Sequence, residues 1–185
     1  MSLIKIRFEV ANETQFSRAF QNLTGQIEDL TKPFQEMQDD FYATMGNVFA
    51  AEGAFEGRAK WVDLSPSYAR WKARHFPGKK ILERSGRLKT SVTVPGGPDN
   101  INSITKTEMI VGTRVPYAIV HHKGLFRLLT NKSGWTLPSA HVTPQRKIIE
   151  LTSDQRKRWV HIMHNYLYGL YKEAAAATKE GVSWT

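Results

Sequence analysis

Hydrophobic positions alternate with charged ones at the start of the chain and then change to a helical period. In residues 1–10 the apolar side chains Leu3, Ile4, Ile6, Phe8 and Val10 mostly alternate with Lys5, Arg7 and Glu9. This alternation predicts a half-buried β-strand. Over residues 13–52 the apolar positions recur at steps of three and four, which predicts helices with one apolar stripe. They are Phe16, Phe20, Leu23, Ile27, Leu30, Phe34, Met37, Phe41, Met45 and Val48.

Pro33 interrupts this stripe. A proline in a helix interior removes a hydrogen bond and clashes with the preceding turn, at a cost of about 3 kcal/mol. We therefore expect two helices broken near Pro33, with Thr31 as the N-cap of the second and Pro33 in its first turn. The stripe either faces the core of its own domain, which is the commoner use of such a face, or forms a seam between subunits.

Short elements are predicted in the middle of the chain. Ser65 and Pro66 have the cap and first-turn chemistry that starts a short helix. An antiparallel β-meander is expected over residues 85–113, beginning with a strand near Leu88. A short helix or turn follows over residues 116–124.

The last part of the chain predicts an extended arm and then a long helix. The arm covers residues 125–143, with a turn at the residues NKSG. The helix covers residues 153–178, with Thr152 and Gln155 at capping-box spacing. The element order predicts an α+β fold in a single domain of residues 1–185, with an N-terminal strand and helix pair, a central meander with short helices, and a long C-terminal helix.

Charge is distributed unevenly along the chain, whose net charge is +9. Residues 1–55 carry four basic and eight acidic side chains, a net charge of −4, so residues 56–185 carry +13. Such asymmetry indicates either a basic face for an acidic partner or nucleic acid, or a basic surface that is only solvated.

Two absences restrict the class of protein. The chain has no cysteine, which excludes disulfides, thiolate metal sites and a cysteine nucleophile. The N-terminal residues alternate in polarity, and no window approaches the ~20 apolar residues of a membrane span. We therefore expect synthesis in the cytoplasm and no contact with a membrane.

Adjacent histidines, His121 and His122, are the most conspicuous candidates for chemistry. Neighbouring side chains point about 100° apart on a helix and to opposite faces on a strand, so the pair does not readily bind one metal. His161 and His164 share a helix face and leave a small metal-dependent hydrolase as one reading, but the spacing nominates no third ligand. Nucleophile elbows, P-loops and dinucleotide motifs are absent. We predict a non-enzymatic protein with no catalytic, cofactor or metal site.

Basic and aromatic residues are interleaved over residues 58–89, a composition typical of grooves for single-stranded nucleic acid. The basic residues are Arg58, Lys60, Arg70, Lys72, Arg74, Lys79, Lys80, Arg84, Arg87 and Lys89. Trp61, Tyr68 and Trp71 lie among them, and we expect Tyr68 and Trp71 to be packed rather than exposed. A nucleic-acid-binding module using this segment is the alternative function.

Several motifs, taken in order, resemble the phage virion morphogenesis family, which contains the Mu-like G protein and tail completion proteins. The motifs are W..LS from Trp61, ILERSGRLKTSV from Ile81, VGT..PYAIVHHKG from Val111 and TPQRKIIELTSDQ from Thr143, and the resemblance covers most of residues 34–170. The family positions that carry it include Trp61, Leu64, Ser65, Leu82, Ser85, Gly86, Leu88, Ser91, Tyr117, Ala118, His121, Gly124, Pro144, Arg146 and Ile149.

The resemblance implies a structural virion protein of a tailed phage or prophage that acts in tail completion or head–tail joining at the neck. It implies a hexameric ring, contacts with neck, connector or tail terminator proteins, and DNA only as the passing genome. The histidine motif would then be structural. We expect His121 to be buried with its ring nitrogens bonded, His122 to face solvent, and Gly124 to end the turn with a positive φ.

Two regions are candidates for contacts between subunits. Residues 16–48 and the arm 125–143 are the candidates for intersubunit packing. Arg156, Lys157 and Arg158 lie in the first turns of the last helix, at its positive end, where cations are mildly unfavourable. Arg146 and Lys147, which precede the helix, complete a basic cluster. We expect this cluster to meet an acidic surface such as the N-terminal helices of a neighbouring subunit, unless these side chains are merely solvated.

Overall fold

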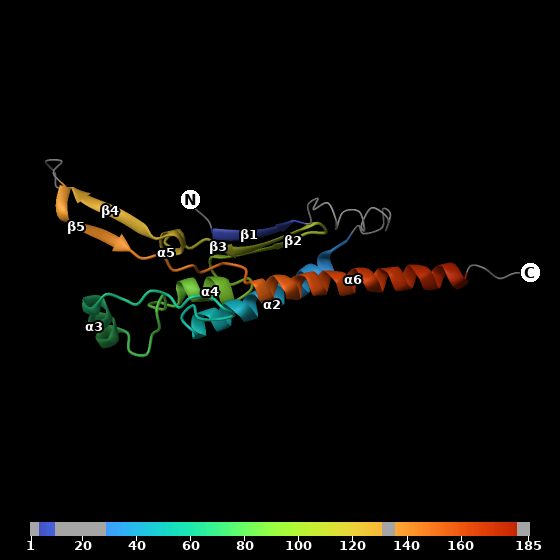
Figure 1. The fold of residues 1–185 in the computed structure, drawn as a ribbon, viewed down its shortest axis with the longest axis horizontal. Helices are drawn as coiled ribbons and strands as arrows, with labels where there is room; N and C mark the ends of the chain where they lie inside the picture. Colours follow the sequence, from blue (N-terminus) through green and yellow to red (C-terminus); the bar gives the residue numbers. More distant parts are fainter. Residues whose placement is uncertain (1–3, 10–28, 131–135, 181–185) are drawn as a thin grey trace, which may run out of the picture.

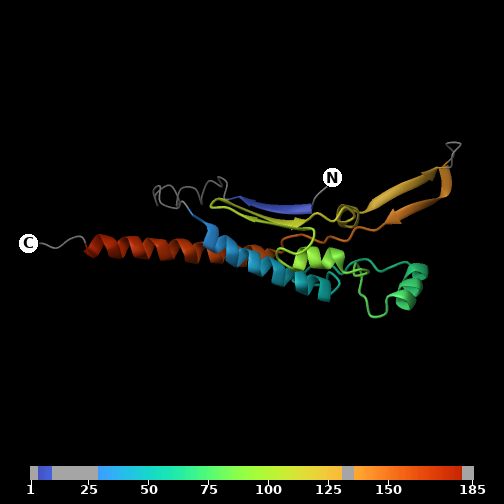
Figure 2. The same cartoon turned by 180° about the vertical axis from the view of Figure 1, so that it is seen from behind.

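A small antiparallel sheet lies against a layer of helices in the computed structural model, which describes residues 4–9, 29–130 and 136–180 (Figures 1 and 2). The sheet contains β1 (Ile4–Glu9), β2 (Asn100–Ile104) and β3 (Glu108–Thr113). The helices against it are α2 (Thr31–Ala50), α4 (Arg87–Thr93) and α6 (Ser153–Glu180). Strands and helices segregate into separate layers, so the predicted α+β class is confirmed.

The third strand is the centre of the sheet, whose order is β1-β3-β2. It pairs antiparallel with β1 from Ile4 opposite Thr113 to Glu9 opposite Glu108. It also pairs antiparallel with β2, a tight hairpin neighbour. The N-terminal strand predicted over residues 1–10 therefore forms one edge of the sheet.

The apolar stripe of α2 is the core of the molecule. Five of its positions have no exposed surface: Phe34, Met37, Phe41, Met45 and Val48. They pack with Leu88 and Val92 of α4, Met109 and Val111 of β3, and Trp159 and Met163 of α6. For residues 29–50 the stripe thus faces its own domain, and the apolar positions 16–27 lie outside the described residues.

The start of α2 differs by one residue from the predicted cap. Pro33 lies in the first turn as expected, but Thr31 is the first helical residue and Leu30 occupies the N-cap. The prediction of Thr31 as a cap is wrong because the Asp29 carboxylate accepts the free Thr31 N–H at 2.9 Å instead.

The strand predicted near Leu88 is also wrong, because Arg87–Thr93 form α4. Leu88, Ser91 and Val92 are buried at helical spacing, and the Ser91 hydroxyl lies 2.7 Å from that of Thr113 on β3. Gly86, with φ +82, turns the chain into the helix. The meander expected over 85–113 is therefore a helix followed by the β2–β3 hairpin.

Three further elements lie at one end of the molecule. They are α3 (Pro66–His75), α5 (Ala118–Lys123) and the antiparallel hairpin of β4 (Leu125–Thr130) and β5 (Thr136–Thr143). Figure 1 shows the hairpin projecting away from the sheet, so the arm predicted over 125–143 is a β-hairpin. Its predicted turn, NKSG, lies outside the described residues.

Helix α6 extends past the sheet at the opposite end (Figure 2). It begins at Ser153, and the backbone N–H of Gln155 donates to the Thr152 hydroxyl at 3.0 Å, as capping-box spacing predicts. The reciprocal bond is not formed, and both polar side-chain atoms of Gln155 are buried without a partner among the residues that the structure describes. Neither α6 nor any other helix in the described residues has the length and apolarity needed to cross a bilayer. That the whole chain is one domain stays a prediction.

Candidate functional site

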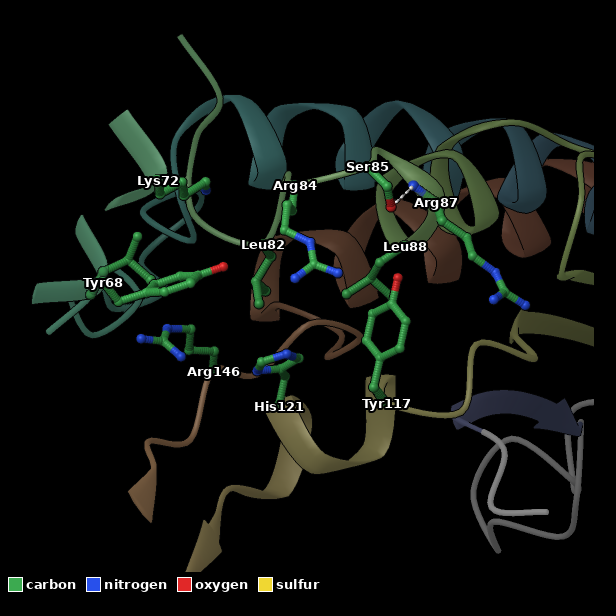
Figure 3. Close-up of a pocket in the computed structure, with 11 residues that line it drawn as sticks. Tyr68, Lys72, Leu82, Arg84, Ser85, Arg87, Leu88, Tyr117, His121 and Arg146 are labelled. Atoms are coloured by element: carbon green, nitrogen blue, oxygen red, sulfur yellow. Dashed lines mark hydrogen bonds between the residues drawn. The ribbon is translucent and has the colours of Figure 1, made fainter. Parts of the chain in front are cut away.

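A pocket of about 440 Å³ brings together several of the residues that carry the family resemblance (Figure 3). Its walls come from α3, the loop before α4, the start of α4, α5 and the segment after β5. The lining residues are Leu64, Tyr68, Lys72, Leu82, Arg84, Ser85, Arg87, Leu88, Tyr117, His121 and Arg146. Segments far apart in the sequence therefore converge on one cavity at the hairpin end of the molecule.

Arg146 holds one wall of this pocket in place. Its side chain is only 5% exposed, and its guanidinium donates to the carbonyl of Val62 at 2.8 Å and that of Asp63 at 3.1 Å. Its backbone N–H donates to the His121 carbonyl at 2.7 Å. Burial lowers the pKa of Arg146, and Asp63 acts in the opposite direction. One residue thus ties the loop before α3 to α5.

Trp61 and Arg58 hold the segment after β5 in a similar way. The Trp61 indole N–H donates to the Lys147 carbonyl at 2.9 Å, and the ring meets Phe49 edge-on at 5.1 Å. Arg58 donates to the carbonyls of Lys147 at 2.6 Å and Ile148 at 3.1 Å. The predicted residue Trp61 does not line the pocket but fixes the segment that carries Arg146.

Two predicted glycines occupy turns at the edges of the pocket. Gly86 precedes α4, and Gly124 follows α5 with φ +77, as expected for a residue that ends that turn. A Cβ on Gly124 would lie 3.1 Å from the backbone nitrogen of Gln145. The close approach and the positive φ both require glycine there. Pro144 lies next to this contact and is partly buried.

Both adjacent histidines are half-buried, and their hydrogen bonding differs from the expectation. His122 accepts a hydrogen bond at Nδ1 from the backbone N–H of Ile148 at 3.2 Å, so it does not simply face solvent. His121 Nδ1 is buried and has no hydrogen-bond partner among the described residues, although its ring meets Tyr117 edge-on at 6.2 Å. Burial is the main cause that lowers the pKa of both histidines, which favours their neutral forms.

Cationic side chains dominate the polar part of the pocket. Lys72 is 4% exposed, donates to the Lys80 carbonyl, and has its pKa lowered mainly by burial. Arg87 pairs with Asp99 at 2.6 and 2.9 Å, and Figure 3 shows it pointing away from the other lining residues. Arg84 is exposed and has no partner among the described residues. Lys72, Arg84 and Tyr68 belong to the basic and aromatic segment 58–89, but spacing along the chain does not predict that they converge on one pocket with His121 and Arg146.

The proposed interface residue Arg158 is held inside its own chain. Its guanidinium donates to Asp40 and Glu56, both at 2.6 Å, and to the Thr44 hydroxyl at 3.2 Å. Glu56 also accepts from the Thr152 hydroxyl at 2.6 Å. The acidic surface that meets Arg158 is therefore formed by α2 and the loop after it in the same chain. The sequence-based expectation placed this surface on a neighbouring subunit instead.

The other members of that basic cluster divide in the same way. Arg146 is buried and bonded to the carbonyls of Val62 and Asp63, as described above, and Lys147 pairs with Glu150 at 2.6 Å. Arg156 and Lys157 are exposed, and Lys157 makes a weak contact with Asp154 at 3.4 Å. Only Arg156 and Lys157 remain available as candidate interface cations.

The basic segment 58–89 is partly used within the chain as well. Lys60, Arg87 and Lys89 pair with carboxylates, and Lys80 donates to the Ala50 carbonyl. The expectation that Tyr68 and Trp71 are packed is wrong. They are 38% and 41% exposed, and a stack of Tyr68, Trp71 and His75 runs along α3, with 5.5 and 4.8 Å between neighbouring rings. The aromatic face remains exposed because α3 lies outside the two main layers (Figure 1).

Metal chemistry has no supporting arrangement in the part of the chain that the structure describes. No group of three His, Cys, Asp or Glu side chains there could hold an ion. His161 and His164 are both exposed, and His164 stacks on Tyr168 with 6.3 Å between ring centroids.

Comparison with known proteins identifies the family. Residues 11–168 match the family described as the phage virion morphogenesis family. No curated protein and no solved structure matches the chain. Because the match covers most of its length, the chain belongs to the phage virion morphogenesis family. Its role is therefore structural, in the assembly of a phage virion.

Proposed function

We propose that this protein completes the tail and joins head to tail at the neck of a tailed phage or prophage-derived particle. The match of residues 11–168 to the phage virion morphogenesis family carries the proposal. The finer role in tail completion is taken from the resemblance of the sequence motifs to that family. Its neighbours would be neck, connector or tail terminator proteins, and DNA would be met only as the passing genome. No catalytic step is required of it.

The shape of the subunit supports assembly into a ring. The β4–β5 hairpin and the free end of α6 project from opposite ends of the body (Figure 1). Ring closure uses heterologous contacts, in which one surface of each subunit meets a different surface of the next. Two projections at opposite ends suit that arrangement, and a hexamer is the ring that we propose.

The outer face of α6 supports a contact with another polypeptide. Val160, Tyr168 and Tyr171 are 58%, 52% and 55% exposed, and they recur at a helical spacing that also includes His164. Exposed apolar groups that form a contiguous stripe mark interaction surfaces more often than scattered ones do. With α2 used for the core, this stripe and the hairpin are the remaining described candidates for intersubunit packing.

The test of the function is a null mutant of the encoding phage or prophage. We expect lysates of the null mutant to contain filled heads and complete-length tails that are not joined, seen by negative-stain electron microscopy. Expression of the wild-type chain in trans should restore joined particles. Joined, infectious particles without the protein would refute the neck role, and a failure to form heads would indicate an earlier step.

A nucleic-acid-binding module is the second candidate, and the exposed aromatic face of α3 favours it. Arg70, Arg74 and Lys79 lie on or just after this helix without an ion-pair partner among the described residues. Binding of a single-stranded oligonucleotide should then weaken steeply with salt. Each Arg→Gln change should reduce the slope of log affinity against log salt concentration by about one, the contribution of one phosphate contact. Salt-independent or undetectable binding would remove this candidate.

A further inference from the structure

The residues that line the pocket of Figure 3 carry positive but no negative charge. Carboxylates nearby act on these cations, Glu52 and Glu83 on Lys72 and Asp63 on Arg146, but they lie outside the lining. Arg146 and Lys72 donate to neutral backbone carbonyls and form no ion pair among the described residues, so their charges stay uncompensated by a direct contact. A concave site lined by charges of one sign concentrates ligands of the opposite sign. The pocket therefore favours an anion.

Two polar groups at the pocket have hydrogen-bonding capacity that nothing in the described chain uses. The Arg84 guanidinium has no partner, and Figure 3 shows it directed toward His121 and Tyr117. His121 Nδ1 is buried and also lacks a partner. Buried polar atoms usually need a hydrogen-bond partner, so His121 Nδ1 and the nearby Arg84 guanidinium together offer polar groups that a ligand can use. The forked donors of arginine fit a carboxylate with two parallel hydrogen bonds.

The remaining walls distinguish between possible anions. Leu64, Leu82 and Leu88 give the cavity an apolar side, which suits an anion attached to a hydrocarbon chain. A nucleic-acid strand needs a groove that follows its backbone, whereas this site is a single pocket of about 440 Å³. Leu82 also has φ +63, an unfavourable conformation for a branched residue and one often found at binding sites.

We propose that this pocket binds a carboxylate of another polypeptide, either an acidic side chain or a chain terminus, with Arg84 as the main ligand-binding residue. The inference rests on the proposed function only for the source of that polypeptide, a neighbouring virion protein. Binding of a carboxylate peptide is measured on the isolated chain, so its failure would leave the null-mutant test of the neck role unaffected.

The test uses the full-length protein and three capped dipeptides followed by NMR. The probes are acetyl-Glu-Leu-amide, with only a side-chain carboxylate; acetyl-Ala-Leu, with only a free terminus; and acetyl-Ala-Leu-amide, with neither. The observed signals are the Arg84 Nε–H and the His121 ring C–H. We expect saturable shifts with at least one of the two carboxylate probes and none with the amide, and the responding probe identifies the source of the carboxylate.

Variants decide whether Arg84 makes the contact. R84Q should weaken binding by roughly ten-fold or more, the range expected for loss of a charge-assisted bond. R74Q is the matched control, because Arg74 is also exposed and unpaired but does not line the pocket, and it should bind like the wild type. Both variants should melt like the wild type, since neither side chain has a partner in the part of the chain that the structure describes.

Four results would overturn the proposal. They are the absence of a saturable shift with both carboxylate probes, equal binding of the amide, equal affinity of R84Q and wild type, and saturation by inorganic phosphate or an oligonucleotide when neither peptide binds.

Discussion

Replacing Arg158 with glutamine should destabilise the monomer, because the side chain joins three elements within one subunit. It contacts α2 through Asp40 and Thr44, and the loop after α2 through Glu56. Asp40 also accepts from the Trp159 indole at 2.7 Å. The change would leave both carboxylates without their cationic partner.

The burial of the three charged side chains sets the size of the effect. Arg158 is 39% exposed, whereas Asp40 and Glu56 are 19% and 16% exposed. Exposed ion pairs contribute about 0–1 kcal/mol, and breaking a fully buried pair costs about 3–5 kcal/mol. The intermediate burial here predicts a loss of about 2–3 kcal/mol in the free energy of unfolding. For a chain of this length that corresponds to a fall of about 4–12 °C in Tm.

Urea titration and differential scanning calorimetry would measure this loss. Arg156→Gln is the matched control, since Arg156 is exposed two residues away and has no ion-pair partner among the described residues. It should change stability by less than about 0.5 kcal/mol. A double-mutant cycle with Asp40→Asn should show a coupling of at least ~1 kcal/mol. If R158Q and R156Q melted alike, Arg158 would not be the internal link described here and the intersubunit role would regain support.

Three further predictions concern the turns and the histidines. Gly124→Ala should destabilise the protein by at least ~1 kcal/mol because of the positive φ and the crowded Cβ position, whereas Gly169→Ala, in open space on α6, should stabilise it by about 0.5–1 kcal/mol. Denaturant midpoints would compare the two, and stability changes of the same sign would contradict the reasoning. His122→Ala should lower the free energy of unfolding by about 1–2 kcal/mol because the Ile148 N–H loses its acceptor, and His121→Ala, which removes no hydrogen bond at Nδ1 among the described residues, should lower it by less. The reverse order of thermal stability would support the sequence-based expectation that His121 is the bonded histidine. Burial lowers the pKa of both histidines, so unfolded chains bind protons more readily and stability should fall as pH drops below about 6.5, the ordinary pKa of histidine. A double His→Gln variant should flatten that dependence in calorimetry.

Local patterns along the chain predicted the parts of the fold that local physics controls. The three-and-four spacing from Phe34 to Val48 predicted a buried helix face, because that periodicity is a property of the helix itself. Alternation predicted the edge strand β1, and Thr152 predicted the start of α6. These features depend on side chains within one or two turns of each other.

Tertiary packing decided what the local patterns missed. The β-branched residues of α4, including Val92, favour a strand locally, but burial against α2 at helical spacing selects the helix. Arg158 was read as an interface residue because the helix dipole disfavours it, yet Asp40, far away in the sequence, supplies its partner. Sequence patterns did not predict the pocket for the same reason, since Lys72, Arg84 and His121 come to line one cavity only after folding.

The central claim is the position of this protein at the neck, and a cryo-electron microscopy reconstruction of the intact particle tests it most directly. We predict a single ring of this fold between head and tail, recognisable by α2 and α6 packed against the β1-β3-β2 sheet. Density for the fold elsewhere in the virion, or a finished neck that lacks it, would contradict the claim.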